Sequence, residues 1–197
     1  TQSRFRSHWN VAALAIQAPI NGTYNVVAVY PHNTTSFTQG LIWHNNTLYE
    51  GTGLTNQSKL FKTELATGKA LQTLSIADTL FGEGITIYNN KLYQLTWQNH
   101  KVLVYDANTF KKEKELNWNY EGWGITHFNN QLIISTGTSN LYFVNPATLA
   151  IEKTLGVYDN NGYIASLNEL EMIEGKIYAN VWGENKIIAI NPASGQV

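Results

Sequence analysis

The chain has 197 residues, and its 13 lysines and arginines against 14 aspartates and glutamates give a formal net charge of −1. Because neither sign dominates, the composition argues against a nucleic-acid or anionic-membrane partner. The absence of cysteine excludes disulfides, thiolate metal sites and a cysteine nucleophile.

The first part of the chain is expected to precede the main domain. No apolar run approaches the roughly 18 residues of a membrane span, and Val11 to Ile16 is too short for the core of a signal peptide. We interpret residues 1–22 as an N-terminal extension. The segment Tyr24 to Tyr30 (YNVVAVY) predicts a lone strand, and we assign residues 23–197 to a single β-domain.

Four similar segments follow, each with the pattern of a strand, a two-residue turn and a second strand. They are GLIWHNNTLYEGTG from Gly40, GITIYNNKLYQLTW from Gly84, GITHFNNQLIISTG from Gly124 and ELEMIEGKIYANVW from Glu169. Asn-Asn or Glu-Gly fills each turn, where these residues tolerate positive φ. Successive turns lie 44, 40 and 45 residues apart. Because a second hairpin follows each segment, the repeat has the four strands typical of a β-propeller blade.

The number of strands does not close a ring. One strand precedes the first repeat, and the fourth repeat stops at Val197, after its third strand and the following turn. A blade takes about 45 residues, so roughly one blade is unaccounted for. We expect an all-β propeller of four-stranded antiparallel blades, with a five-bladed parent domain and about one blade missing from this chain.

Alignment on the turns brings out eight positions at the opposite end of the hairpins. The positions that open the inner strands hold Gln39, Glu83, Trp123 and Asn168, and those that close the next strands hold Gly53, Trp97, Gly137 and Trp182. Both sets lie away from the turn in an antiparallel hairpin, so all eight are expected on one rim around the channel mouth. Three tryptophans beside one carboxylate and two carboxamides favour a small-ligand pocket over simple packing between blades.

Two phenylalanines extend this pattern. Phe37 and Phe81 each stand two residues before a polar rim position, on the same face of an extended strand. They are candidates for further pocket walls, and packing between blades is the alternative.

Several motifs together resemble those of the plant- and bacterial-type glutaminyl cyclases, or glutamine cyclotransferases. They are SFTQGL from Ser36, FGEGIT from Phe81, EGWG from Glu121, LNELE from Leu167 and ANVW from Ala179. The resemblance runs from about Tyr24 to Val197. It implies a five-bladed propeller that converts N-terminal glutamine to pyroglutamate with loss of ammonia, acting on a peptide or protein partner.

The resemblance also implies roles for individual residues. Glu83 matches the family's catalytic glutamate, and the substrate-binding residues match Phe37, Gln39, Phe81, Trp97, Trp123, Asn168 and Trp182. Thr136 stands where the family commonly has an aspartate. The residue types suit the chemistry, because stiff aromatic walls hold a productive rotamer and a carboxyl in an apolar site moves a proton near neutral pH.

Other polar residues have competing interpretations. Glu121, Glu169 and Glu171 are further carboxylates near the rim, and we rank them below Glu83. The five histidines show no spacing that converges on a metal, so no metal is assigned to the catalytic site. No cofactor is expected for catalysis; a structural cation such as calcium, held by backbone carbonyls in the central channel, leaves no sequence signature and stays open.

Two functions from different classes fit the rim. The first is an aminoacyltransferase of the cyclising kind, with Glu83 as proton shuttle. The second is a non-catalytic propeller that binds a peptide or partner on the same surface, since fold alone does not fix function. A sugar or lactone hydrolase is a weaker third, because the rim has too few carboxylates for a metal cage. We expect a secreted or periplasmic location.

Overall fold

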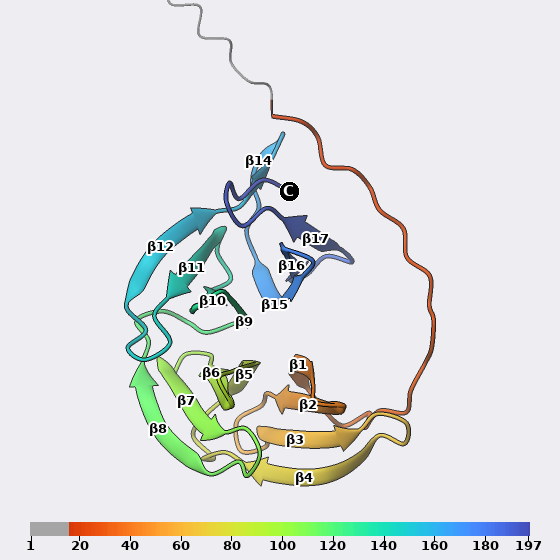
Figure 1. Ribbon diagram of the computed structural model, residues 1–197, viewed down its shortest axis with the longest axis vertical. Helices are drawn as coiled ribbons and strands as arrows, with labels where there is room; N and C mark the ends of the chain where they lie inside the picture. The colour runs from red at the N-terminus through yellow and green to blue at the C-terminus, as the bar shows by residue number, and fades with distance from the viewer. Residues whose placement is uncertain (1–15) are drawn as a thin grey trace, which may run out of the picture.

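The computed structural model describes residues 16–197, which contain strands and turns but no helix. The strands form four blades arranged around an axis, as Figure 1 shows in the view along it. The predicted all-β propeller with four-stranded antiparallel blades is therefore confirmed. With no helix in this part of the chain, none of its segments is a candidate membrane-spanning helix.

The blades follow one another in chain order, each running from an inner to an outer strand. The first contains β1 (Thr38–His44), β2 (Thr47–Thr52), β3 (Lys59–Glu64) and β4 (Lys69–Ser75). The second contains β5 (Gly82–Tyr88), β6 (Lys91–Thr96), β7 (Lys101–Asp106) and β8 (Lys112–Asn117). The third contains β9 (Ile125–Phe128), β10 (Gln131–Ser135), β11 (Asn140–Val144) and β12 (Ile151–Gly156).

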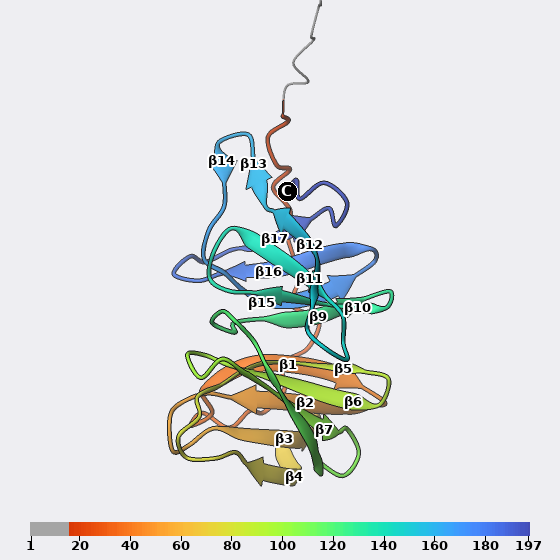
Figure 2. The same cartoon turned by 90° about the vertical axis from the view of Figure 1, so that its left-hand side faces the viewer.

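The last blade in the described residues has three strands, β15 (Leu167–Ile173), β16 (Lys176–Val181) and β17 (Ile187–Ile190). A short hairpin, β13 (Tyr158–Asp159) and β14 (Gly162–Tyr163), precedes it and projects beyond the blades in Figure 2. The ring is open between β1 of the first blade and β15–β17 of the last (Figure 1). A five-bladed parent stays a prediction.

The turns of the inner hairpins have the backbone that their sequences predict. Asn45 and Asn46 have φ of 48° and 58°, and Asn89 and Asn90 have 50° and 59°. Two successive residues with positive φ match the right-handed twist of the strands they join. Glu174 and Gly175, at 48° and 78°, do the same in the last blade.

Apolar layers between neighbouring blades form the core, and strand alternation builds them. In β10, Leu132 and Ile134 pack toward the second blade, while Ile133 between them packs toward the last. Successive side chains of a strand point to opposite faces, so each central strand serves two layers. Burial on both faces explains why these strands read as continuous apolar runs.

Glycines let the inner strands approach one another around the axis. A Cβ on Gly84 would lie 2.7 Å from the carbonyl oxygen of Trp123, and one on Gly124 would lie 2.0 Å from that of Asn168. The Gly84 N–H donates to the Trp123 carbonyl at 2.9 Å, which ties the second blade to the third. The fourth repeat has Glu169 at the equivalent position, beside the open side of the ring.

The segment before β1 differs from expectation. The strand predicted over Tyr24 to Tyr30 does not form, and Val27 is 97% exposed. The segment pairs with no strand among the described residues, and an unpaired strand leaves its backbone groups to water. It crosses the open side of the ring in Figure 1 and is fastened near its end, where His32 Nε2 lies 3.0 Å from Glu50 Oε1. Of the predicted extension, residues 1–15 lie outside the described part of the chain.

Candidate active site on the rim of the propeller

The eight aligned positions come together at one end of the blades, as their spacing predicts. Gln39, Glu83 and Asn168 are the second residues of β1, β5 and β15, while Trp123 stands two residues before β9. Trp97 and Trp182 directly follow β6 and β16. A repeated backbone hydrogen bond holds this end closed: Trp97 donates to Phe81 at 3.1 Å, and Trp182 donates to Ser166 at 2.8 Å.

Irregular strand pairing changes the direction of the polar side chains on the rim, and the repeat pattern in the sequence does not predict this irregularity. The register with the second strand shifts between Thr38 and Gly40, between Gly82 and Ile85, and between Leu167 and Leu170. These three shifts contain Gln39, Glu83 and Asn168. A bulge inserts an unpaired residue and turns a side chain away from the regular alternation. The inner strands therefore depart from regular pairing where the candidate site needs side chains to converge.

The aromatic residues form two groups of edge-to-face contacts. Phe81 lies between Phe37, at 6.3 Å between ring centroids, and Trp97, at 5.6 Å. Trp123 and Trp182 meet at 6.0 Å with an interplanar angle of 81°. All five predicted aromatic residues thus contact another member of the set. Trp182, at 65% exposure, has most of its surface free for a ligand.

Two glycines make room for these rings. A Cβ on Gly53 would lie 2.5 Å from the ring of Phe81, and one on Gly137 would lie 2.6 Å from the ring of Trp123. Glycine and tryptophan alternate at this repeat position, so each glycine provides the space that a neighbouring aromatic ring fills.

Glu121 joins the two aromatic groups. One carboxylate oxygen accepts hydrogen bonds from Trp97 Nε1 at 2.9 Å and from Trp123 Nε1 at 3.0 Å. The other accepts from Gln98 Nε2 at 2.9 Å. Partial burial acts to raise the pKa of Glu121, but the hydrogen bonds from Gln98, Trp123 and Trp97 outweigh it and lower the pKa. The EGWG motif marked this residue as a carboxylate near the mouth without revealing its partners.

Glu83 has the opposite electrostatic character. Its side chain is buried, at 7% exposure, and burial raises its pKa from 4.5 to about 8, with a further contribution from the charge of Glu121. Two neighbouring carboxyl groups whose pKa values are pushed apart give one site both a proton donor and a fixed negative charge. At neutral pH Glu83 is therefore mainly protonated, while Glu121 is ionised.

A cavity of about 410 Å³ opens beside Gln39, Asn168 and Trp182. The Oδ1 atom of Asn168 is buried and has no hydrogen-bond partner. A buried acceptor without a partner costs free energy, which a donor on a bound ligand would recover. Glu169 also borders this cavity, and burial raises its pKa to about 8.

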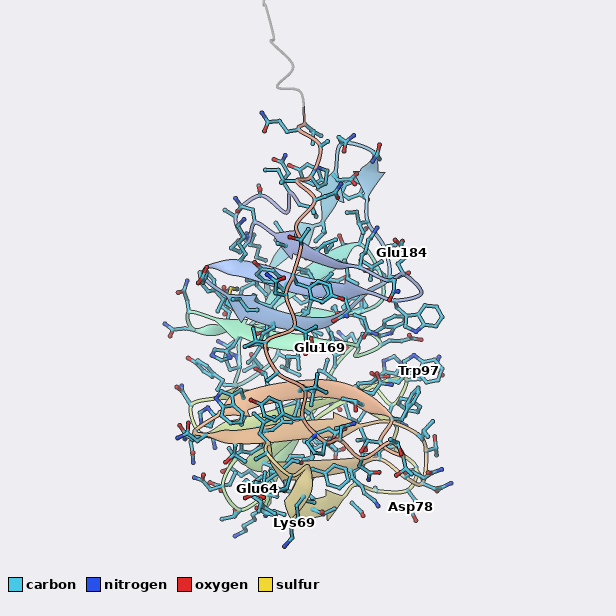
Figure 3. All side chains as sticks on the ribbon, turned by 90° about the vertical axis from the view of Figure 1, so that its right-hand side faces the viewer. Glu64, Lys69, Asp78, Trp97, Glu169 and Glu184 are labelled. Atoms are coloured by element: carbon cyan, nitrogen blue, oxygen red, sulfur yellow. The ribbon has the colours of Figure 1, made fainter. Side chains whose placement is uncertain are left out.

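Figure 3 views the molecule from its open side and separates Glu169 from the rim. Trp97 and Glu184 lie toward the same end of the blades, whereas Glu169 lies farther in along the opening. The charge of Glu121 contributes to the raised pKa of Glu83, whereas the charge of Glu171 contributes to that of Glu169.

The remaining sequence candidates lie elsewhere or are altered. His44 and His127 border a second cavity of about 500 Å³ at the turn end of the hairpins, with Asn89 and Asn129. The hydroxyl of Thr136, where the family resemblance implies an aspartate, lies 3.1 Å from that of Thr138. Among residues 16–197, no three histidine or acidic side chains cluster in a way that suits a metal ion.

Comparison with known proteins fixes the family. The sequence profile described as glutamine cyclotransferase matches residues 5–197, nearly the whole chain. The chain belongs to the glutamine cyclotransferase family. It is 37% identical over 174 residues to a glutaminyl-peptide cyclotransferase of Arabidopsis thaliana, an alignment that covers 87% of this chain and 54% of that protein. It thus spans about half the length of this curated family member.

Solved structures agree with the fold. The glutaminyl cyclase of Myxococcus xanthus superposes with a TM-score of 0.80 at 32% identity, covering 85% of this chain and 71% of that one. The WD40 domain of Neurospora crassa Pan2 superposes at 0.56, covering 77% of this chain and 46% of that one, but its 12% identity shows the propeller fold alone.

Proposed function

We propose that the protein is a glutaminyl-peptide cyclotransferase, which closes an N-terminal glutamine of a peptide or protein into pyroglutamate and releases ammonia. The observation that carries the proposal is the buried, mainly protonated carboxyl of Glu83, on the rim that also carries the aromatic residues. The names of the Arabidopsis and Myxococcus relatives support the same activity.

The proposed reaction needs a proton moved between two nitrogens of one substrate. The α-amine attacks the side-chain amide carbon and forms the new C–N bond, and the amine nitrogen loses a proton. The amide nitrogen gains a proton and leaves as ammonia when its C–N bond breaks. Glu83 donates its proton to the leaving nitrogen and takes the one released by the attacking amine, so the carboxyl ends the cycle as it began.

The pKa of Glu83 suits this exchange. A free α-amine has a pKa of about 7.7–8.0, and the carboxyl pKa is also about 8. Near that pH the neutral amine and the protonated acid coexist in useful fractions. The proposal predicts a pH–rate profile with a narrow maximum near pH 8, falling on both sides.

The walls and the carboxamides position the substrate. Both reacting groups belong to one glutamine residue, so the main task is to hold a rotamer in which amine and amide carbon meet. The rings of Phe81, Trp97 and Trp123 are fixed by mutual contacts and hydrogen bonds and are suited to that task. Asn168 Oδ1 accepts a hydrogen bond from a substrate N–H, and the Gln39 amide donates to the amide oxygen as it gains charge.

Ammonia release from a short peptide with N-terminal glutamine tests the proposal. The wild-type chain is expected to release one ammonia per peptide and to lower the peptide mass by that of ammonia. A peptide with N-terminal asparagine is the substrate control, because its shorter side chain would have to close a four-membered ring.

The Glu83→Gln variant should fold and lose most turnover, by a factor of about 10²–10⁴, because general acid–base catalysis supplies a gain of that size. Glu113→Gln, which removes a carboxylate from the outer strand β8, should keep wild-type turnover. Binding of the glutamine peptide with no ammonia release would instead support the non-catalytic propeller. Unchanged turnover in Glu83→Gln would remove Glu83 from the mechanism.

Two further expectations stay predictions. The proposed proton transfers need no cofactor. Metal analysis of the purified protein would test whether a structural cation lies in the central channel. A secreted or periplasmic location stays open to cell fractionation.

A further inference from the structure

The loop that carries Glu121 is fixed on both sides of the residue. It runs from the end of β8 to the start of β9, and Trp118 at its beginning is buried at 3% exposure. The Trp118 indole N–H donates to the backbone carbonyl of Glu121 at 3.3 Å. The next amide, that of Gly122, donates to the carbonyls of Thr96 and Trp97, both at 3.1 Å. The backbone of Glu121 is thus held before any substrate binds.

Packing below the loop adds to this restraint. Tyr120 stacks on Tyr142 at 4.9 Å between ring centroids, and its backbone carbonyl lies 3.0 Å from the Nδ1 atom of His100. Gly122 is held so closely that a Cβ there would lie 2.8 Å from the side chain of Leu95. The loop therefore has little room to shift relative to the second blade.

The carboxylate of Glu121 fixes two rings that come from different blades. Trp97 follows β6 of the second blade, and Trp123 precedes β9 of the third. Both indole N–H groups meet the same oxygen, at 2.9 and 3.0 Å. An indole ring turns about two side-chain bonds, so a hydrogen bond at its N–H end fixes the orientation that packing on its faces leaves free.

We propose that Glu121 is a positioning residue, which sets the separation and tilt of Trp97 and Trp123 on the propeller rim and presents a fixed negative charge to Glu83. This inference rests on the proposed cyclisation for its kinetic consequence and on the hydrogen bonds alone for its structural one. Glu121 acts through the two indoles and through the charge it presents to Glu83, and it has no share in the bonds made or broken.

The charge of Glu121 gives the proposal a signature that a merely structural residue lacks. It contributes to the raised pKa of Glu83, and the side chain of His100 is the other titratable group that acts on Glu121. Removing the charge lowers the pKa of Glu83, so the high-pH limb of the pH–rate profile moves toward acid. Loss of ring orientation alone would lower the rate without moving that limb.

Two variants separate these effects. Glu121→Gln keeps the length of the side chain and one acceptor oxygen but removes the charge, whereas Glu121→Ala removes both. We expect the high-pH limb to move toward acid in both variants. We expect kcat/KM at the optimum to fall by about 10²-fold in Glu121→Ala, the loss typical of misplaced positioning groups, and by less in Glu121→Gln. Glu113→Gln is the matched control for removal of a carboxylate away from the rim.

The ¹⁵N–¹H spectrum of the indole N–H groups tests the structural part without turnover. Trp97→Phe and Trp123→Phe assign the two signals. In the wild type both are expected to titrate together below the usual pKa of glutamate, and in Glu121→Ala both are expected at positions typical of indoles that donate to water.

The outcomes separate this inference from the proposed function. Indole signals that are the same in Glu121→Ala and wild type would overturn the positioning role, as would kcat/KM in Glu121→Ala equal to that of Glu113→Gln. A wild-type chain that releases no ammonia would overturn the proposed function, and the indole signals would still decide whether Glu121 holds the two rings.

Discussion

Replacement of Glu83 by glutamine has a calculable effect on stability. Burial raises the pKa of the Glu83 carboxyl from 4.5 to about 8. The folded protein holds this proton more tightly than the unfolded chain does, so the stability that the group contributes is complete below about pH 4.5. That contribution is lost as the pH rises to about 8, and each pKa unit corresponds to about 1.4 kcal/mol. Ionisation of Glu83 therefore costs the folded state about 5 kcal/mol.

Glutamine is neutral at every pH, so the variant avoids this cost. The free energy of unfolding of Glu83→Gln, relative to wild type, should rise by about 4 kcal/mol between pH 5 and pH 9. Urea denaturation of both proteins at several pH values measures it by linear extrapolation. Glu113→Gln should show no comparable trend. A difference between Glu83→Gln and wild type that stays constant over this range would show that Glu83 ionises normally, and the account of its neutral state would be wrong.

Two further substitutions test the rim, and a third, in a turn away from it, serves as a control. Gly137→Ala should destabilise the fold by about 1–3 kcal/mol and lower kcat/KM, because its Cβ meets the ring of Trp123. Gly175 also has a positive φ, but there is open space around it. Gly175→Ala should therefore lower the melting temperature less than Gly137→Ala does and leave kcat/KM unchanged. Asn168→Leu should leave the melting temperature equal or higher, because the unpartnered oxygen of Asn168 costs stability in the free protein. The same variant should reduce kcat/KM at least tenfold, because the proposed hydrogen bond to the substrate is lost. A lower melting temperature with intact activity would contradict both expectations.

The repeat made the fold predictable from sequence. The turn pairs such as Asn45-Asn46 fix where each inner hairpin reverses, and the number of residues from the turn then fixes which end of the blade a residue reaches. The same count places Glu83 and Trp97 at the rim end of their strands, so the sequence predicts that they share one surface without any knowledge of tertiary contacts. It failed for Tyr24 to Tyr30, because a strand forms only where a neighbour pairs with it, and strand pattern alone does not show whether one is present.

The site was less predictable because its decisive features depend on contacts between blades. The bulge around Glu83 depends on how β5 pairs with β6, and nothing in FGEGIT requires the shift. Glu121 was visible as an acidic residue, but its role comes from two indoles that arrive from different strands. The pKa of Glu83 likewise follows from burial in the assembled ring. The sequence therefore predicts where Glu83 and Glu121 lie, whereas their protonation states depend on burial and hydrogen bonds that only the folded structure shows.

Differences among equivalent positions, rather than the repeat itself, give the rim its chemistry. The propeller brings the same backbone position to the axis in each blade, and a regular sequence would place identical side chains there. Here glycines at 53 and 137 alternate with Trp97 and Trp182, and the space that the two glycines leave is filled by the rings of Phe81 and Trp123. Burial keeps the carboxyl of Glu83 mainly protonated near neutral pH, while Glu121 remains ionised through its hydrogen bonds. Two glutamates on the same rim thus hold opposite protonation states at neutral pH, and the proposed cyclisation, in which one carboxyl must supply a proton, needs that difference.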